Sequence, residues 1–84
     1  MPKINIELQQ TLTERMSDTF DLIVRTDGDA SPHLRWLAAE GIEVKRQFRL
    51  TPGLAVSCTG QDALRLLEAD WVISVELDAP VRAL

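Results

Sequence analysis

The turn Thr51-Pro52-Gly53, in the middle of the chain, most constrains what this sequence can fold into. Proline holds φ at a fixed value and glycine is free to take a positive φ, a combination typical of a tight turn. Strand-like segments lie directly on both sides, at residues 43–50 and residues 54–58. The pattern therefore predicts a β-hairpin at the centre of the domain.

A strand and a helix are predicted on each side of this hairpin. Before it, residues 20–26 alternate as a strand, and a helix runs from its cap at Ser31 to a stop at Gly41. After it, Thr59 caps a second helix and Val72 enters the last strand. The order βαββαβ predicts an α+β fold, the ferredoxin-like split βαβ sandwich. Its four-stranded antiparallel sheet has the order 4-1-3-2, with both helices on one face.

The residues before the first strand predict a short N-terminal helix over residues 3–18. One narrow apolar stripe supports it, formed by Ile4, Leu8, Leu12 and Met16. Because the stripe is thin, we expect this helix to lie against the domain rather than to build it. The chain then divides into a helical lead-in (1–18), a domain (19–80) and a C-terminal tail (81–84).

The composition limits the partners of the chain. With 84 residues it fits one domain, and its net charge of -4 argues against a nucleic-acid partner, which requires positive charge against phosphates. One cysteine, Cys58, and one histidine, His33, argue against a disulfide and a structural zinc site. We therefore expect no metal and no cofactor.

The sequence also bears on membranes and location. No apolar run approaches the roughly 20 residues that a membrane-spanning helix needs, and the N-terminus has no signal-peptide core. We expect no membrane association. If Met1 is the native start, a cytoplasmic location follows, whereas a segment excised from a secreted precursor would be extracellular.

The alternation within each element predicts which side chains form the core. The residues expected between the helices and the sheet are Val24, Leu37, Phe48, Val56, Leu67 and Val75. In the second helix, Leu64 and Leu67, joined by Ala63, are expected on the inner face. Within residues 43–50, Arg46 is expected on the same face as Val44, Phe48 and Leu50. In the last strand, Ile73, Val75 and Leu77 are expected on one face.

The other face of the sheet has no cover among the predicted elements, and this asymmetry is the main clue to function. The residues assigned to this open face are Asp21, Ile23, Arg25, Lys45, Gln47, Arg49, Ser57, Ser74, Glu76 and Asp78. Most of them are comfortable in water, so a solvated sheet face is the simplest interpretation.

Glu76 and Asp78 stand two residues apart on one face of the last strand. Acid-base catalysis by such a pair requires a pocket and a partner that separates their pKa values, and the sequence offers no histidine, cysteine or second acidic cluster for it. Two carboxylates on a flat face suit instead the free N–H groups at the N-termini of a partner's helices. We therefore expect a binding protein rather than an enzyme.

Three segments together resemble the propeptide-like inhibitor family of subtilisin-type serine proteases (inhibitor I9 type). They are Phe20-Asp21-Leu22-Ile23-Val24-Arg25, Pro52-Gly53-Leu54-Ala55-Val56, and the run from Val72 through Glu76 and Asp78 to Val81. The similarity covers roughly residues 20–84. The most specific element is Val75-Glu76-Leu77-Asp78 followed by a six-residue tail.

The resemblance implies an inhibitor, a folding chaperone, or both, for a subtilisin-like serine protease. Glu76 and Asp78 would cap two protease helices at the open face. The tail would lie in the substrate cleft, with Leu84 at P1, Ala83 at P2, Arg82 at P3 and Val81 at P4. From the residues alone, this tail is either such an insert or a frayed chain end, since Pro80 stops the strand pairing before it.

A function from a different class stays open: a small ligand-sensing or dimerising regulatory module that uses the same open face. The two hypotheses predict different behaviour. An inhibitor is expected to be monomeric when free and to lose potency when its last residues are removed. A dimerising module is expected to be indifferent to that truncation.

Overall fold

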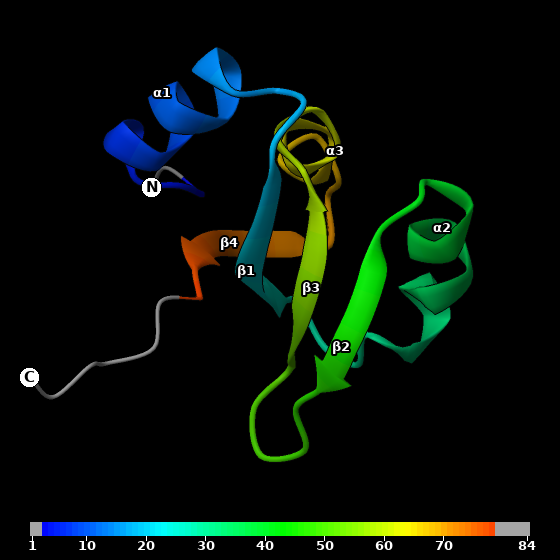
Figure 1. Ribbon diagram of the computed structural model, residues 1–84. Helices are drawn as coiled ribbons and strands as arrows, with labels where there is room; N and C mark the ends of the chain where they lie inside the picture. The colour runs from blue at the N-terminus through cyan, green and yellow to red at the C-terminus, as the bar shows by residue number, and fades with distance from the viewer. Residues whose placement is uncertain (1–2, 79–84) are drawn as a thin grey trace, which may run out of the picture.

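Four strands form one antiparallel sheet in the computed structural model, which describes residues 3–78 (Figure 1). The strands are β1 (Thr19–Thr26), β2 (Glu43–Gln47), β3 (Gly53–Thr59) and β4 (Val72–Leu77). Their order across the sheet is β2-β3-β1-β4, which read from the β4 edge is 4-1-3-2. The α+β arrangement resembles a ferredoxin-like layout.

The helices lie on one side of this sheet. They are α1 (Ile6–Glu14), the short 3₁₀ turn η1 (Ser31–His33) with α2 (Leu34–Ala39), and α3 (Gly60–Leu66). Leu12, Leu37 and Leu66, from the three α-helices, belong to one buried cluster with the inward side chains of the strands. Figure 1 shows α1 beside α3 at the top of the view and α2 alongside β2.

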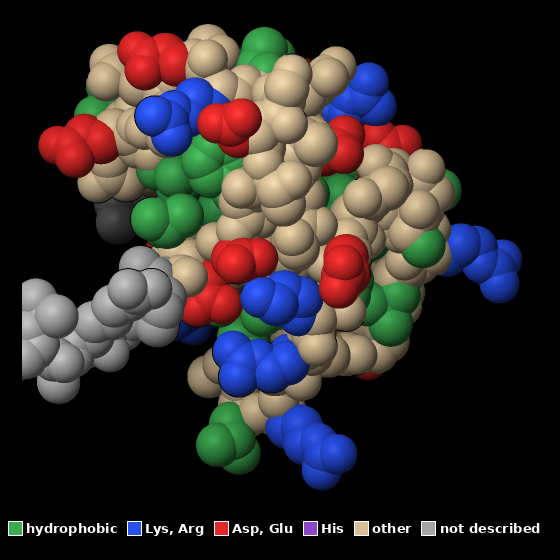
Figure 2. Space-filling view, viewed as in Figure 1, with side chains coloured by type: hydrophobic (Ala, Val, Ile, Leu, Met, Phe, Trp, Pro, Cys, Tyr) green, Lys and Arg blue, Asp and Glu red, His purple; other side chains and the backbone are tan. Residues whose placement is uncertain are grey.

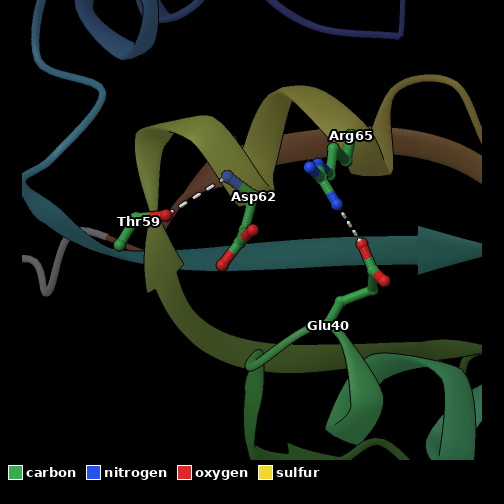
Figure 3. A network of polar contacts seen from close by, with 4 residues as sticks. All are labelled: Glu40, Thr59, Asp62 and Arg65. Carbon is green, nitrogen blue, oxygen red and sulfur yellow. Dashed lines mark hydrogen bonds and ion pairs between the residues drawn. The ribbon is translucent and has the colours of Figure 1, made fainter.

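Local sequence signals fix the helix ends. The Thr59 hydroxyl accepts a hydrogen bond of 3.2 Å from the Asp62 N–H, as expected for the cap of α3 (Figure 3). Gly41 has a φ of 80°, so it takes the left-handed conformation predicted after α2.

The start of the helical segment formed by η1 and α2 differs from the prediction. Ser31 does not cap it, because Ser31 is the first residue of η1 and the N-cap position is Ala30, whose side chain makes no capping bond. The Asp29 carboxylate accepts hydrogen bonds from the Ser31 N–H at 3.0 Å and from its hydroxyl at 2.9 Å. These bonds, the backbone one foremost, lower the pKa of Asp29.

Two helices that are separate in sequence are joined by an ion pair. The Arg65 guanidinium of α3 lies 2.7 Å from the Glu40 carboxylate at the end of α2 (Figure 3). The hydrogen bond to Glu40 raises the pKa of Arg65. Because the pair is partly exposed to solvent, its net contribution to stability is small.

The N-terminal segment is more closely integrated than expected. Leu12 is fully buried in the core, and the Ile4 backbone forms a parallel bridge with Val75 at the β4 edge. The end of α1 approaches α3 so closely that a Cβ at Gly60 would lie 2.7 Å from the Leu12 carbonyl oxygen. The helix therefore helps to build the core, contrary to the expectation, while the division of the chain at residues 18 and 80 stays a prediction.

A β-bulge in β2 changes which side chains face the helices. Val44 pairs with Val56, but the next pair is Arg46 with Ala55, so Lys45 is the extra residue. Arg46 therefore lies on the open face and Gln47 on the helix side, the reverse of the prediction. The Gln47 amide donates to the Ser31 hydroxyl at 3.0 Å, which agrees with this placement.

A second irregularity shifts β4. Arg25 pairs with Ser74, but Thr26 pairs with Val72, so Ile73 is the extra residue. Val72 is buried and Ile73 is 55% exposed, although uninterrupted alternation predicts the opposite. Leu77 follows the predicted face, since it pairs with Leu22, but it lies near the end of the edge strand and is 53% exposed.

Most of the predicted core is confirmed. Val24, Leu37, Val56 and Val75 are fully or almost fully buried. Leu67 is half-buried against the core. The prediction for Phe48 is wrong, because its half-buried ring lies against Gly53 and under the Arg46 guanidinium, on the side of the open face. In α3, Ala63 is fully buried as predicted, but the other fully buried side chain is Leu66, and the predicted Leu64 and Leu67 are only half-buried.

The central turn needs its glycine for a different reason than predicted. Among residues 3–78, only Gly28 and Gly41 have a positive φ, so Gly53 does not use that freedom. A Cβ at Gly53 would lie 2.9 Å from the Val24 carbonyl oxygen and 3.1 Å from the Phe48 ring. Gly53 is therefore required for the close approach of the hairpin to β1.

Candidate functional site: the open sheet face

The open face is the surface of the sheet that lies opposite the helices. Cross-strand pairing assigns its residues row by row, because directly paired residues point to the same side. The residues on it are Asp21, Ile23 and Arg25 of β1, Glu43 and Arg46 of β2, Gly53, Ala55 and Ser57 of β3, and Ser74 and Glu76 of β4. Within residues 3–78, no helix and no further strand covers this surface.

In the middle of the open face, β3 presents only small residues, and longer side chains cover them. Gly53 and Ala55 are buried under their neighbours and Ser57 is half-buried. The longer side chains of β1 and β2 stand on either side. A partner therefore meets these longer side chains at the centre of the face and does not reach the β3 backbone.

The charges of the open face are mixed, and only some of them are paired. The Lys45 ammonium lies 3.3 Å from the Asp21 carboxylate, which links β2 to β1 across β3. Arg25, Glu43 and Glu76 are exposed. Figure 2 shows blue basic and red acidic side chains side by side in the lower centre of the view.

The two carboxylates singled out in the sequence lie at the β4 edge of the open face. Glu76 is in β4, exposed, and paired with Ile23 of β1. Asp78 directly follows the strand and is half-buried, and its N–H donates to the Asp21 carbonyl oxygen at 2.9 Å. The backbone is thus held in register as far as Asp78, and the exposed Glu76 carboxylate is available as a hydrogen-bond acceptor.

The predicted tail residues are Val81, Arg82, Ala83 and Leu84. They lie outside the described residues, as does the Pro80 break before them. Their roles stay predictions from the sequence.

Sequence reasoning missed Arg46 and Glu43 as members of the open face. Arg46 was expected among apolar neighbours on the helix side, where a charged group without a partner is costly. That conflict was the one signal in the sequence that the alternation of β2 is interrupted. Gln47, and Arg49 in the loop after β2, leave the predicted set.

A groove runs along the β4 edge, next to the open face. It has a volume of about 670 Å³ and is bordered by α1 and β4, with Leu8, Phe20 and Leu77 among its apolar lining residues. Figure 2 shows green side chains gathered below α1 on the left of the view. Glu76 also lines this groove, so it stands where the groove and the open face meet.

The aromatic residues lie on the helix side and act in packing. The His33 and Trp71 rings stack with centroids 4.1 Å apart, and Trp36 meets Trp71 edge-on at 5.8 Å. Trp71 is packed against the core and His33 is half-buried, whereas Trp36 is more exposed.

Neither the cysteine nor a cluster of ligands suggests a reactive site in the part of the chain that the structure describes. Burial raises the pKa of the Cys58 thiol to about 12, with a smaller contribution from the Asp62 carboxylate. A thiol with this pKa is not a nucleophile at neutral pH. Residues 3–78 contain no group of three or more His, Cys, Asp or Glu side chains that could hold a metal ion.

No helix among residues 3–78 has both the length and the apolar character needed to cross a membrane. Compared with known proteins, the chain matches no protein-family model, and no curated protein has a significantly similar sequence.

Proposed function

We propose that this domain inhibits a subtilisin-type serine protease by docking its open face on the protease. One observation carries the proposal: β4 presents an exposed carboxylate, Glu76, on an uncovered sheet face and is followed at once by Asp78. The likeness of residues 20–84 to propeptide-like inhibitors supplies the identity of the partner.

The physical role of the two carboxylates is to cap helices of the protease. A helix N-terminus has N–H groups without intrahelical partners and a positive dipole end, so it is stabilised by an anion placed beside it. In the same proposal, residues 81–84 occupy the substrate cleft and make the inhibition competitive.

The experiment is a titration of a broad-specificity subtilisin with the wild type and with the double variant Glu76→Gln, Asp78→Asn. Each lost cap costs about 0.5–2 kcal/mol of binding. The inhibition constant of the double variant should therefore rise clearly while its melting temperature stays near that of the wild type. Glu14→Gln, an exposed change on α1, serves as the matched control.

The outcome separates the parts of the proposal. An unchanged inhibition constant for the folded double variant would reject helix capping. Deletion of residues 81–84 should abolish most inhibition without lowering the melting temperature, because end residues contribute little to a fold. Equal inhibition by the truncated and full chains would reject insertion into the cleft, and no inhibition of any subtilisin tested would reject the function.

A further inference from the structure

One row of residues crosses all four strands of the open face. Glu76 of β4 pairs with Ile23 of β1, Ile23 pairs with Ala55 of β3, and Ala55 pairs with Arg46 of β2. The row therefore has a carboxylate at one sheet edge, a guanidinium at the other edge, and two apolar residues between them.

The two charges of this row do not neutralise each other within one chain. Three strand spacings of about 4.8 Å separate them, about 14 Å in all, which exceeds the screening length of about 8 Å at physiological salt. Neither residue belongs to the ion pairs found within residues 3–78. Arg46 instead extends its guanidinium over the Phe48 ring, 5.7 Å from its centroid.

A row with this order is complementary to itself. We propose that a second copy of the chain docks face to face on the open face, with a two-fold axis along the strands between β1 and β3. Glu76 of each copy then meets Arg46 of the other, and the two Ile23 side chains lie on either side of the axis. This is an isologous interface, in which one patch serves both partners.

The surroundings of the row favour this contact. Sheets that pack face to face keep their strands within about 30° of each other and lie about 10 Å apart, with side chains of both faces filling the space between them. The half-buried Ile23 supplies an apolar centre. The charge order also fixes the orientation, because an axis across the strands would oppose Glu76 to its own copy and Arg46 to its own copy.

The inference differs from the free monomer expected from the sequence. The monomer was expected of an inhibitor, whereas the alternative of a dimerising module used the same open face. Uninterrupted alternation in β2 placed Arg46 on the helix side, where no such row exists, and the bulge at Lys45 brings it to the open face. Self-association does not depend on the proposed inhibition, but both use Glu76. A dimer would therefore conceal the surface that is proposed to bind the protease.

Sedimentation at low ionic strength, without any protease, tests the dimer. The wild type should associate as its concentration rises towards the millimolar range. Glu76→Arg and Arg46→Glu should each weaken association about tenfold or more, because each places like charges opposite each other. An equimolar mixture of the two variants should associate again as a heterodimer, and so should the double variant that carries both changes.

Two charge reversals away from the open face serve as controls. Arg35→Glu on α2 and Glu14→Arg on α1 are exposed and should leave association unchanged. A wild type that is monomeric at every concentration would overturn the inference. So would single variants that associate as well as the wild type, or a mixture that fails to recover association.

Discussion

The two faces of the sheet are formed by the same four strands but differ in how deeply their side chains are buried. On the helix side, Leu22, Val24 and Val56 are fully buried, and any change there alters packing. On the open face, the neighbouring Asp21, Ile23 and Arg25 are exposed or half-buried. The comparison teaches that stability resides on one face and leaves the other free for binding.

The strongest test of this contrast compares adjacent residues of β1. Leu22→Ala removes a fully buried side chain and should lower the free energy of unfolding by about 2–5 kcal/mol. Ile23→Ala, one residue along but on the open face, should cost only about 1 kcal/mol. Urea unfolding of both variants measures the difference, and equal losses would mean that the faces are assigned wrongly.

A second prediction asks whether α1 belongs to the packed side. Gly60→Ala would place a methyl group 2.7 Å from the Leu12 carbonyl oxygen and 2.8 Å from the Arg15 carbonyl oxygen. Because backbone atoms cannot yield as a flexible side chain does, α1 should shift, at a cost of about 1–3 kcal/mol. Thermal melting provides the measurement. An unchanged melting temperature would show that α1 packs loosely on α3.

A third prediction uses Cys58, which lies on the helix side and next to the open-face Ser57. The pKa of Cys58 is raised by burial to about 12, whereas the thiol of an unfolded chain has a pKa near 9.0. The unfolded chain therefore loses a proton above pH 9.0 that the folded chain retains, so folding should weaken as the pH rises from about 9 towards 12.

Unfolding free energies near about pH 8 and about pH 10 check this pH dependence. The wild type should lose more stability between them than Cys58→Ala, in which the other titrating groups are unchanged. Thiol labelling provides the contrast between the faces: Cys58 should react slowly, and Ser57→Cys in the Cys58→Ala background rapidly. Equal losses of stability by the wild type and Cys58→Ala would argue against a buried thiol.

The sequence predicts the helix side better than the open face. Val24, Leu37 and Val75 could be placed in the core because burial demands apolar side chains, and their spacing reveals which side is buried. The strand order followed from the handedness of the crossovers and the short hairpin. The cap at Thr59 and the stop at Gly41 followed from local backbone chemistry.

The open face was predicted less well because its residues must only be compatible with water. One extra residue, Lys45, moved Arg46 to the open face and Gln47 to the helix side. In β4 the extra residue Ile73 left Val72 buried on the helix side in its place. A bulge depends on how two strands pair, so the sequence of either strand alone hardly indicates it. The depth of α1 in the core depended likewise on Gly60, which lies far from α1 in sequence.

The most direct test of the central claim, that the open face binds the protease, is the inhibition constant of Ile23→Arg for a broad-specificity subtilisin. The new charge lies at the centre of the open face, next to Glu76, and should weaken inhibition at least about tenfold. Gln10→Arg, an equal change on the exposed side of α1, should inhibit like the wild type. If Ile23→Arg is folded and inhibits as well as Gln10→Arg, the open face is not the binding surface.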